Sequence, residues 1–161
     1  MSQLPDAPPR AFDPNAPFEI FLVATPGLEA ALRAEAAALG FSEPRQVEGG
    51  VTLTGGWPDV WRANLELRGA TRVLARFASF RAMHLAQLDK RARRAPWAAI
   101  LRPDVPVSVE ASCRKSKIYH AGAAAQRVAT AIREELGAPV VDKAPLTIMV
   151  RIEDDLVTLS V

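Results

Sequence analysis

The sequence predicts an α+β fold in two consecutive parts, and three observations lead to this prediction. A chain of 161 residues is long enough for one large domain or two small ones. Short apolar runs of strand length alternate with longer segments of helical periodicity. The charge also changes along the chain. Residues 68–133 hold fourteen Lys or Arg and three acids, a net charge of +11, whereas the rest holds six and fifteen, a net charge of −9, which together give the overall +2.

The first part begins with a strand and a helix. Residues 18–24, FEIFLVA, form a short apolar run with aromatic and β-branched side chains, which indicates a buried strand. Thr25 and Pro26 are residue types preferred at a helix N-cap and at the first helical position, and Gly40 is typical just after a helix end. The apolar stripe of the predicted helix is formed by Leu28, Leu32, Ala36 and Leu39.

A hairpin, a second helix and a strand follow. Residues 45–55 predict two short strands around the Gly49-Gly50 turn. Pro58 marks the start of a helix and Gly69 its end. Three large apolar residues share one side of this helix because they are spaced by four: Trp57, Trp61 and Leu65.

Residues 71–80, TRVLARFASF, alternate along the chain and predict a strand with arginines near one face. The predicted order up to this point is β-α-β-β-α-β. This is the order of the ferredoxin-like split unit, in which two helices cover one face of an antiparallel sheet.

The second part starts with a helix and a strand. Leu85, Leu88 and Ala92 are expected to face inward from a helix that ends before Pro96, and the following WAAIL segment predicts another short helical turn. Residues 105–113 alternate cleanly and predict a strand whose inward face ends with Cys113.

A long helix and two strands complete this part. The helix begins at His120 and ends at Gly137, with an apolar stripe formed by Ala121, Ala124, Ala125, Val128, Ile132 and Leu136. Two strands, LTIMVRI and LVTLSV, are joined by a turn at residues 153–155, so the Asp154-Asp155 pair is interpreted as turn chemistry.

The composition excludes several classes of protein. No apolar run is long enough to span a membrane, and the N-terminus lacks the basic and apolar regions of a signal peptide. A single cysteine excludes an internal disulfide framework and indicates a reducing, cytoplasmic setting. Five prolines in residues 1–17 predict an extended, poorly ordered lead-in. The chain ends within a strand pattern, so we expect more of the protein to follow Val161.

Reactive side chains gather in residues 112–128, SCRKSKIYHAGAAAQRV, but their spacing favours neither catalysis nor a metal. His84, His120 and Cys113 match no known ligand spacing, so no metal site is expected. A cysteine nucleophile needs a base within reach, and Lys115 and His120 are near in sequence. On the inward face of a strand, however, a cysteine acts as a small hydrophobe. No glycine-rich phosphate loop motif is present.

The same segment is better interpreted as a polyanion-binding loop. The candidate residues are Arg114, Lys115, Ser116, Lys117, Tyr119 and His120. Its three cations lie between a strand end and a helix N-terminus, where unpaired N–H groups and the helix dipole favour phosphate. Ser116 is a potential donor to a phosphate oxygen, and the rings of Tyr119 and His120 are of the kind that stack on bases in single-stranded RNA readers. A solvated basic loop is the alternative.

Further cations extend this candidate surface. Arg91, Arg94 and Arg127 lie off the apolar stripes of their predicted helices. If the charge segregation serves a polyanion, the cations of residues 90–94 should share one face with those of residues 114–117.

Several separated motifs resemble one known family. The segment SCRKSKIYHAGAAAQRV is similar to the signature of the THUMP domain in the bacterial large-subunit rRNA guanine-N2 methyltransferase family, where Ser/Cys-Arg-x-Ser-x-x-x-His leads into an Ala/Val-rich helix. FLVATPGLEAALRAEAAALGF, GGVTLTG and WRANLELRGATRVLARF resemble the N-terminal segments of that family in the same order. VDKAPLTIMVRIEDDLVTLSV resembles its closing strands, so the resemblance spans residues 18–161.

The resemblance implies a ferredoxin-like N-terminal subdomain followed by a THUMP domain, an α/β module that binds RNA. We therefore expect a lead-in over residues 1–16, the ferredoxin-like subdomain over 17–80 and the THUMP domain over 81–161. In the family, this pair precedes a Rossmann-type methyltransferase domain that uses S-adenosylmethionine. The glycine-rich cofactor loop and the Asn/Asp-Pro-Pro motif of that domain are absent from this sequence. We expect RNA binding without catalysis or cofactor here, and S-adenosylmethionine in the whole protein.

The resemblance also selects residues. Arg114, Ser116 and His120 match positions of the family motif, while Lys115 and Lys117 lie at positions within it that are more variable. Arg68 and Arg72 fall in the matched LRGATR segment, where a structural role between the two subdomains is the alternative.

Two rival interpretations stay open. THUMP modules also occur in tRNA thiolation and tRNA methylation proteins, so tRNA is an alternative to rRNA as the partner. A ferredoxin-like domain can also serve protein–protein interaction without any RNA.

Overall fold

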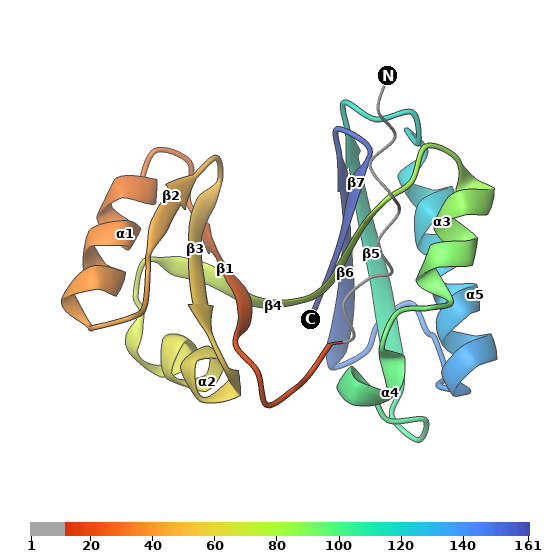
Figure 1. Ribbon diagram of the computed structural model, residues 1–161, viewed down its shortest axis with the longest axis horizontal. Coiled ribbons are helices and arrows are strands. Elements are labelled where there is room, and N and C mark those ends of the chain that lie inside the picture. Colours follow the sequence, from red (N-terminus) through yellow and green to blue (C-terminus); the bar gives the residue numbers. More distant parts are fainter. Residues whose placement is uncertain (1–11) are drawn as a thin grey trace. The chain divides into compact units, whose positions relative to one another are not determined.

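The computed structural model describes residues 12–161 of the chain and has a mixed α+β architecture (Figure 1). Most of the lead-in predicted for residues 1–16 therefore lies outside the described residues. The described strands form a seven-stranded sheet with the order β2-β3-β1-β4-β7-β6-β5. Two compact units share this chain, one formed mainly by residues 14–77 and the other mainly by residues 78–159. We call them the first and the second unit.

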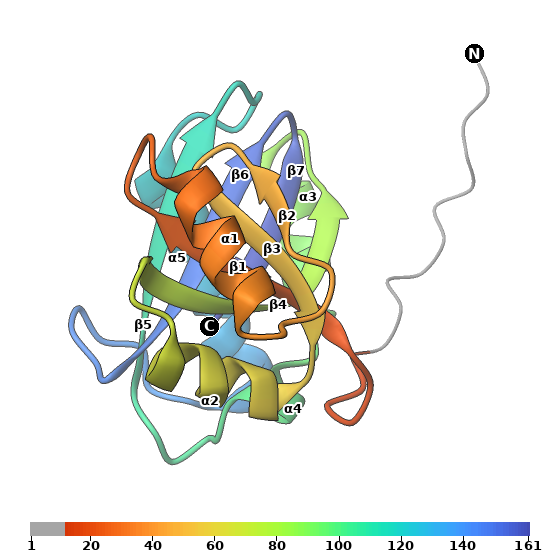
Figure 2. The same ribbon diagram turned by 90° about the vertical axis from the view of Figure 1, so that its left-hand side faces the viewer.

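The first unit has the predicted β-α-β-β-α-β order. Its elements are β1 (Phe18–Ala24), α1 (Glu29–Ala38), β2 (Arg45–Val47), β3 (Gly50–Gly55), α2 (Trp57–Glu66) and β4 (Ala70–Arg81), whose last residues belong to the second unit. β1 pairs antiparallel with both β3 and β4, and β2 pairs antiparallel with β3. Both helices cover the same face of these strands (Figure 2). The ferredoxin-like prediction is thus confirmed.

The N-terminus of α1 differs from its prediction. The helix begins at Glu29, because Gly27 has a left-handed backbone (φ +90°) and the Leu28 N–H donates to the Thr25 carbonyl oxygen at 3.0 Å. These contacts form a turn ahead of the helix, so Thr25 does not cap it and Pro26 is not its first residue. The end at Gly40 is as predicted, with a left-handed glycine (φ +78°) just past the helix.

The side of α2 that carries Trp61 and Leu65 faces solvent and is not the buried side of the helix. Trp61 is 63% exposed and Leu65 is 87% exposed, whereas Val60 and Ala63 are buried. The Gly56 N–H donates to the Asp59 carboxylate at 2.9 Å and sets how the helix starts. Val60 and Ala63 therefore belong to the face of α2 that packs inward.

The second unit is built around a parallel strand pair. Its elements are α3 (Leu85–Ala92), α4 (Trp97–Ile100), β5 (Val107–Arg114), α5 (Ala121–Leu136), β6 (Leu146–Glu153) and β7 (Leu156–Ser160). β5 and β6 are parallel, with Val107 opposite Leu146 and Arg114 opposite Glu153. α5 is the crossover that parallel strands require.

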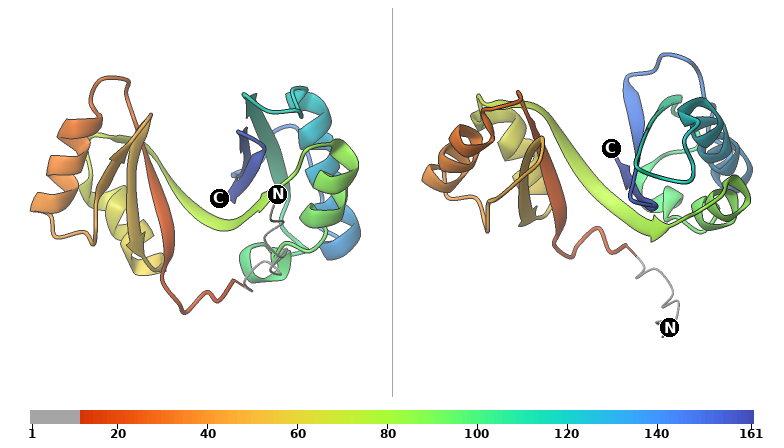
Figure 3. Two further views of the ribbon diagram at one scale, coloured as in Figure 1. Left: turned by 45° about the horizontal axis from the view of Figure 1, so that its top comes forward. Right: turned by 90° about the horizontal axis from the view of Figure 1, so that it is seen from above.

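Helices α3 and α5 lie side by side in both views of Figure 3. Leu88 and Ala92 of α3 and Val128 and Ile132 of α5 are fully buried, as the predicted stripes require. α5 ends at Gly137 in the left-handed conformation (φ +78°), also as predicted. Among the described residues, no helix is long and apolar enough to cross a membrane.

A matched pair of leucines tests which helix faces of the first unit are buried. Leu32→Ala should lower the free energy of unfolding by about 2–5 kcal/mol, because Leu32 is 1% exposed. Leu65→Ala should change it by no more than about 0.5 kcal/mol, because that side chain is 87% exposed. Urea denaturation followed by circular dichroism measures both. A larger cost at Leu65 would contradict the orientation of α2.

Candidate nucleic-acid interface

The candidate interface is centred on the loop between β5 and α5, residues 114–120, which we call the basic loop. β5 ends at Arg114, and Lys115 follows with a left-handed backbone (φ +47°). This conformation is uncommon for a residue with a side chain and costs on the order of 1 kcal/mol. Ile118 is 4% exposed and anchors the loop in the core of the second unit. The surrounding contacts therefore hold the loop in one shape.

The turn between β6 and β7 supplies many of these contacts. The Ser116 hydroxyl donates to the Arg114 carbonyl oxygen at 2.9 Å and accepts from the Asp155 N–H at 3.0 Å. The Lys117 N–H donates to Asp155 Oδ1 at 2.8 Å, and the Asp154 N–H donates to the Arg114 carbonyl oxygen at 3.3 Å. The turn and the basic loop are thus bonded along their lengths, although 39 residues separate Ser116 from Asp155.

His120 caps the helix that follows the basic loop. Its Nδ1 accepts a hydrogen bond from the Ala123 N–H at 3.0 Å. His84 does the same at the start of α3, where its Nδ1 accepts from the Gln87 N–H at 3.2 Å. An accepting Nδ1 carries no proton, so the Nε2 N–H of each neutral ring is the donor that remains.

Several side chains of the second unit are presented to solvent around the basic loop. Tyr119 is 85% exposed, and the backbone of Lys115 places its side chain in an exposed position. The Lys117 ammonium lies 3.8 Å from the sulfur of Met83, which is 46% exposed. The segment ahead of α3 therefore lies beside the basic loop. Met83 and Asp155 are not among the predicted site residues, because no sequence pattern joins them to residues 114–120.

Arg114 is partly neutralised. Its guanidinium lies 3.8 Å from a carboxylate oxygen of Glu153, and the Arg114 side chain is 53% exposed. Glu153 also accepts from Arg151. The Arg114 guanidinium thus forms an ion pair within the protein, while about half of the side chain stays accessible to solvent.

The other predicted cations lie on other elements, and Arg91 and Arg94 lie away from the basic loop. Arg91 lies in the last turn of α3 and Arg94 just beyond its end, whereas Met83 and the basic loop lie at its start. Arg127 is exposed in the second turn of α5. Arg68 and Arg72 are exposed residues of the first unit, and the Arg68 N–H donates to Glu35.

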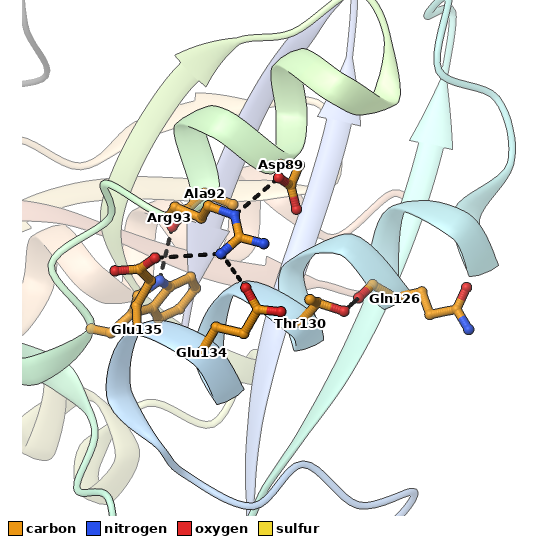
Figure 4. Close-up of polar contacts among 8 residues, drawn as sticks. Asp89, Ala92, Arg93, Gln126, Thr130, Glu134 and Glu135 are labelled. Carbon is orange, nitrogen blue, oxygen red and sulfur yellow. Dashed lines mark hydrogen bonds and ion pairs between the residues drawn. The ribbon is translucent and has the colours of Figure 1, made fainter.

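Acidic residues surround Arg93 at the C-terminal ends of α3 and α5. Figure 4 shows that Arg93, at the end of α3, is bonded to Asp89 of α3 and to Glu134 and Glu135 of α5. The hydrogen bonds that Arg93 donates to Asp89 and Glu134 raise its pKa above the ordinary value of an arginine. This network joins the C-terminal ends of α3 and α5, so part of the positive charge of residues 90–94 is used inside the protein.

Cys113 is half-buried, so the prediction of a buried position is corrected. The residue is the last but one of β5, in the half of the strand that has no fully buried residue. Burial still raises the pKa of its thiol. A raised pKa lowers the thiolate fraction, which is the opposite of what a nucleophile needs. Within residues 12–161, no three His, Cys, Asp or Glu side chains form a group that could hold a metal ion.

Two family models match the chain. The model described as the RlmL ferredoxin-like domain matches residues 19–74, and the THUMP domain model matches residues 82–161. Between them the two matches take in most of the chain.

Known proteins resemble the same region. The ribosomal RNA large subunit methyltransferase K/L of Syntrophotalea carbinolica is 34% identical over 118 residues, which is 73% of this chain and 16% of the relative. A structure described as a predicted N6-adenine-specific DNA methylase from Listeria monocytogenes has a TM-score of 0.80 at 29% identity, covering 89% of this chain and 40% of that one. A possible methylase from Clostridium difficile has a TM-score of 0.77 at 27% identity, with the same two coverages. The chain thus corresponds to less than half the length of each of these proteins.

The raised pKa of Cys113 predicts its alkylation behaviour. The rate of reaction with iodoacetamide should have its midpoint at a higher pH in the folded chain than in the urea-unfolded chain, because a higher pKa keeps the thiol protonated to higher pH. Mass spectrometry across pH 7 to 10 measures this. A folded midpoint at or below the unfolded one would contradict the structural role of Cys113.

The capping role of His120 is tested by two substitutions. His120→Ala should lower the free energy of unfolding by about 0.5–2 kcal/mol, because the Ala123 N–H loses its acceptor. His120→Asn should cost less than half as much, since asparagine is a favoured N-cap. Thermal denaturation compares the two variants. Equal losses would show that the ring contributes by packing instead.

Proposed function

The chain belongs to the proteins that carry an RlmL ferredoxin-like domain followed by a THUMP domain, and on this premise we propose that it is the RNA-binding module of an RNA methyltransferase. We place the interface on the second unit, at the basic loop. The single observation that carries this proposal is the fixed loop itself, which presents Lys115, Lys117 and Tyr119 beside the N-terminus of α5.

The chemistry of this loop suits the backbone of RNA. Cations and a helix N-terminus attract phosphate, which carries no sequence information. Tyr119 offers an exposed ring on which an unpaired base can stack. Binding is therefore salt-dependent and has low sequence specificity.

The distribution of charge favours a compact contact over a broad one. Arg91 and Arg94 lie at the other end of α3, and Arg93 is engaged by acids. We assign the main phosphate contacts to Arg114, Lys115 and Lys117, with a secondary contribution from Arg127. Arg91 and Arg94 are proposed as contacts only with an RNA long enough to reach beyond the basic loop. Arg68 and Arg72 of the first unit are proposed as further contacts.

We further propose that the whole protein is an S-adenosylmethionine-dependent rRNA guanine-N2 methyltransferase, in which this region positions RNA for a separate catalytic domain. The name of the Syntrophotalea carbinolica relative supports rRNA as the substrate class. The subdomain boundaries that go with this proposal are residues 17–80 and 81–161.

The proposal is tested by measuring binding of the 161-residue chain to rRNA and tRNA fragments between 25 and 300 mM salt. We expect binding at low salt that weakens as salt rises. Tighter binding of tRNA than of rRNA would favour a tRNA-modifying protein, and no binding at 25 mM salt would favour a protein-interaction domain.

A matched pair of lysines locates the interface on the second unit. Lys115→Gln should weaken RNA binding about two- to fivefold and reduce the salt slope by about one, because one phosphate contact is lost. Lys143→Gln removes the same charge from an exposed position that precedes β6, at the opposite end of the parallel strands. It should change neither quantity.

Fluorescence anisotropy with a labelled RNA measures both variants. Equal losses at Lys115 and Lys143 would show that binding follows net charge only, and would contradict an interface at the basic loop.

A further inference from the structure

We propose that Asp155 is a positioning residue that holds the basic loop in its RNA-binding shape, and that Ser116 acts through it and does not contact RNA itself. This inference rests on the proposed function and adds to it two roles that the family signature does not specify.

Asp155 binds two segments of the chain with three different groups. Its carboxylate Oδ1 accepts from the Lys117 N–H at 2.8 Å, and its own N–H donates to the Ser116 hydroxyl at 3.0 Å. Its carbonyl oxygen accepts from the Ala82 N–H at 3.0 Å. Ala82 is fully buried and directly precedes Met83, whose sulfur lies beside the Lys117 ammonium. One residue of the β6–β7 turn thus fixes both the basic loop and the chain ahead of α3.

The backbone of the turn explains why an aspartate suits this position. Asp154 and Asp155 both have left-handed backbones, with φ of +49° and +62°. Two consecutive residues of this kind form the tight turn that suits a two-residue hairpin, and Asp, Asn and Gly tolerate it best. Of these three residues, Asp and Asn have a short side-chain oxygen that can reach the Lys117 N–H.

The negative charge of Asp155 is unfavourable for the phosphate binding proposed for the neighbouring loop. A carboxylate beside a phosphate-binding loop repels phosphate, so its presence there weakens binding through charge alone. Its benefit must then come from the position it gives to the loop. Charge and position can be separated, because Asp155→Asn removes the charge and keeps the acceptor oxygen.

The one hydrogen bond that the Ser116 hydroxyl can donate is already used. A hydroxyl has one proton to donate, and that of Ser116 goes to the Arg114 carbonyl oxygen. Its oxygen accepts from the Asp155 N–H. Donation to a phosphate would break the contact between the Ser116 hydroxyl and the carbonyl oxygen at the end of β5. Ser116 therefore transmits the position of the β6–β7 turn to the basic loop.

The experiment compares Asp155→Asn with Asp155→Gly in the 161-residue chain. Both substitutions remove the same charge and both tolerate the left-handed backbone, but glycine lacks the acceptor for the Lys117 N–H. We expect Asp155→Asn to bind an rRNA fragment at least as tightly as the unmodified chain. Asp155→Gly should bind about three- to tenfold more weakly than Asp155→Asn, the effect of one hydrogen bond. Equal affinities of the two variants would overturn the inference.

Hydrogen exchange gives a second readout that needs no RNA. The Lys117 amide should lose at least about tenfold of its protection in Asp155→Gly and keep it in Asp155→Asn. The Ala82 amide, which bonds to the backbone of residue 155, should stay protected in both and shows that the unit is folded. Equal Lys117 protection in the two variants would overturn the positioning role. Absence of RNA binding by the unmodified chain would instead overturn the proposed function and leave the exchange result to decide the role of Asp155.

Ser116→Ala separates a positioning role from RNA contact. If Ser116 acts through Asp155, Ser116→Ala should lower the hydrogen-exchange protection of the Asp155 amide, which loses its acceptor, and of the Lys117 amide, which bonds to the Asp155 carboxylate. Unchanged protection of both amides together with weaker RNA binding would show that Ser116 contacts RNA directly.

Discussion

The parallel register of β5 and β6 is the constraint on which the candidate interface depends. Parallel strands need a crossover, and here the crossover is α5, so a loop must leave the carboxyl end of β5 and enter a helix N-terminus. The register places Arg114 opposite Glu153, so both strands end at the same level. The β6–β7 turn consequently lies against the basic loop, and Asp155 can bond to Ser116 and Lys117.

In this arrangement, the positive charge that the second unit offers to a partner is concentrated at the basic loop. Residues 68–133, most of which belong to the second unit, have a large net positive charge, but folding places acids from other segments beside several of the cations. Glu153 lies near Arg114, and Glu134 and Glu135 bond to Arg93. The net charge of a segment is therefore a poor guide to the potential at its surface, and the three cations of the basic loop are the more useful measure.

Side chains that look reactive in the sequence have structural roles in this fold. His84 and His120 each cap a helix with Nδ1, and the Ser116 hydroxyl links two loops. Burial raises the pKa of Cys113 and disfavours its thiolate. The cluster at residues 113–120 is thus explained by the need to shape a loop between a strand and a helix, and the accessible groups that remain are cationic and aromatic.

The sequence by itself determined the order of the elements, the hairpin at residues 45–55 and the helix ends at Gly40 and Gly137. These features are local, because periodicity and left-handed glycines act over a few residues. Tertiary structure decided that Val60 and Ala63 pack inward on α2 while Trp61 and Leu65 face solvent, since spacing reveals which residues share a side and not which side meets the sheet. It also decided that Asp155 meets the basic loop and that Arg91 and Arg94 do not. Such contacts depend on strand register and helix packing, which join residues far apart in the chain, and no short-range pattern encodes them.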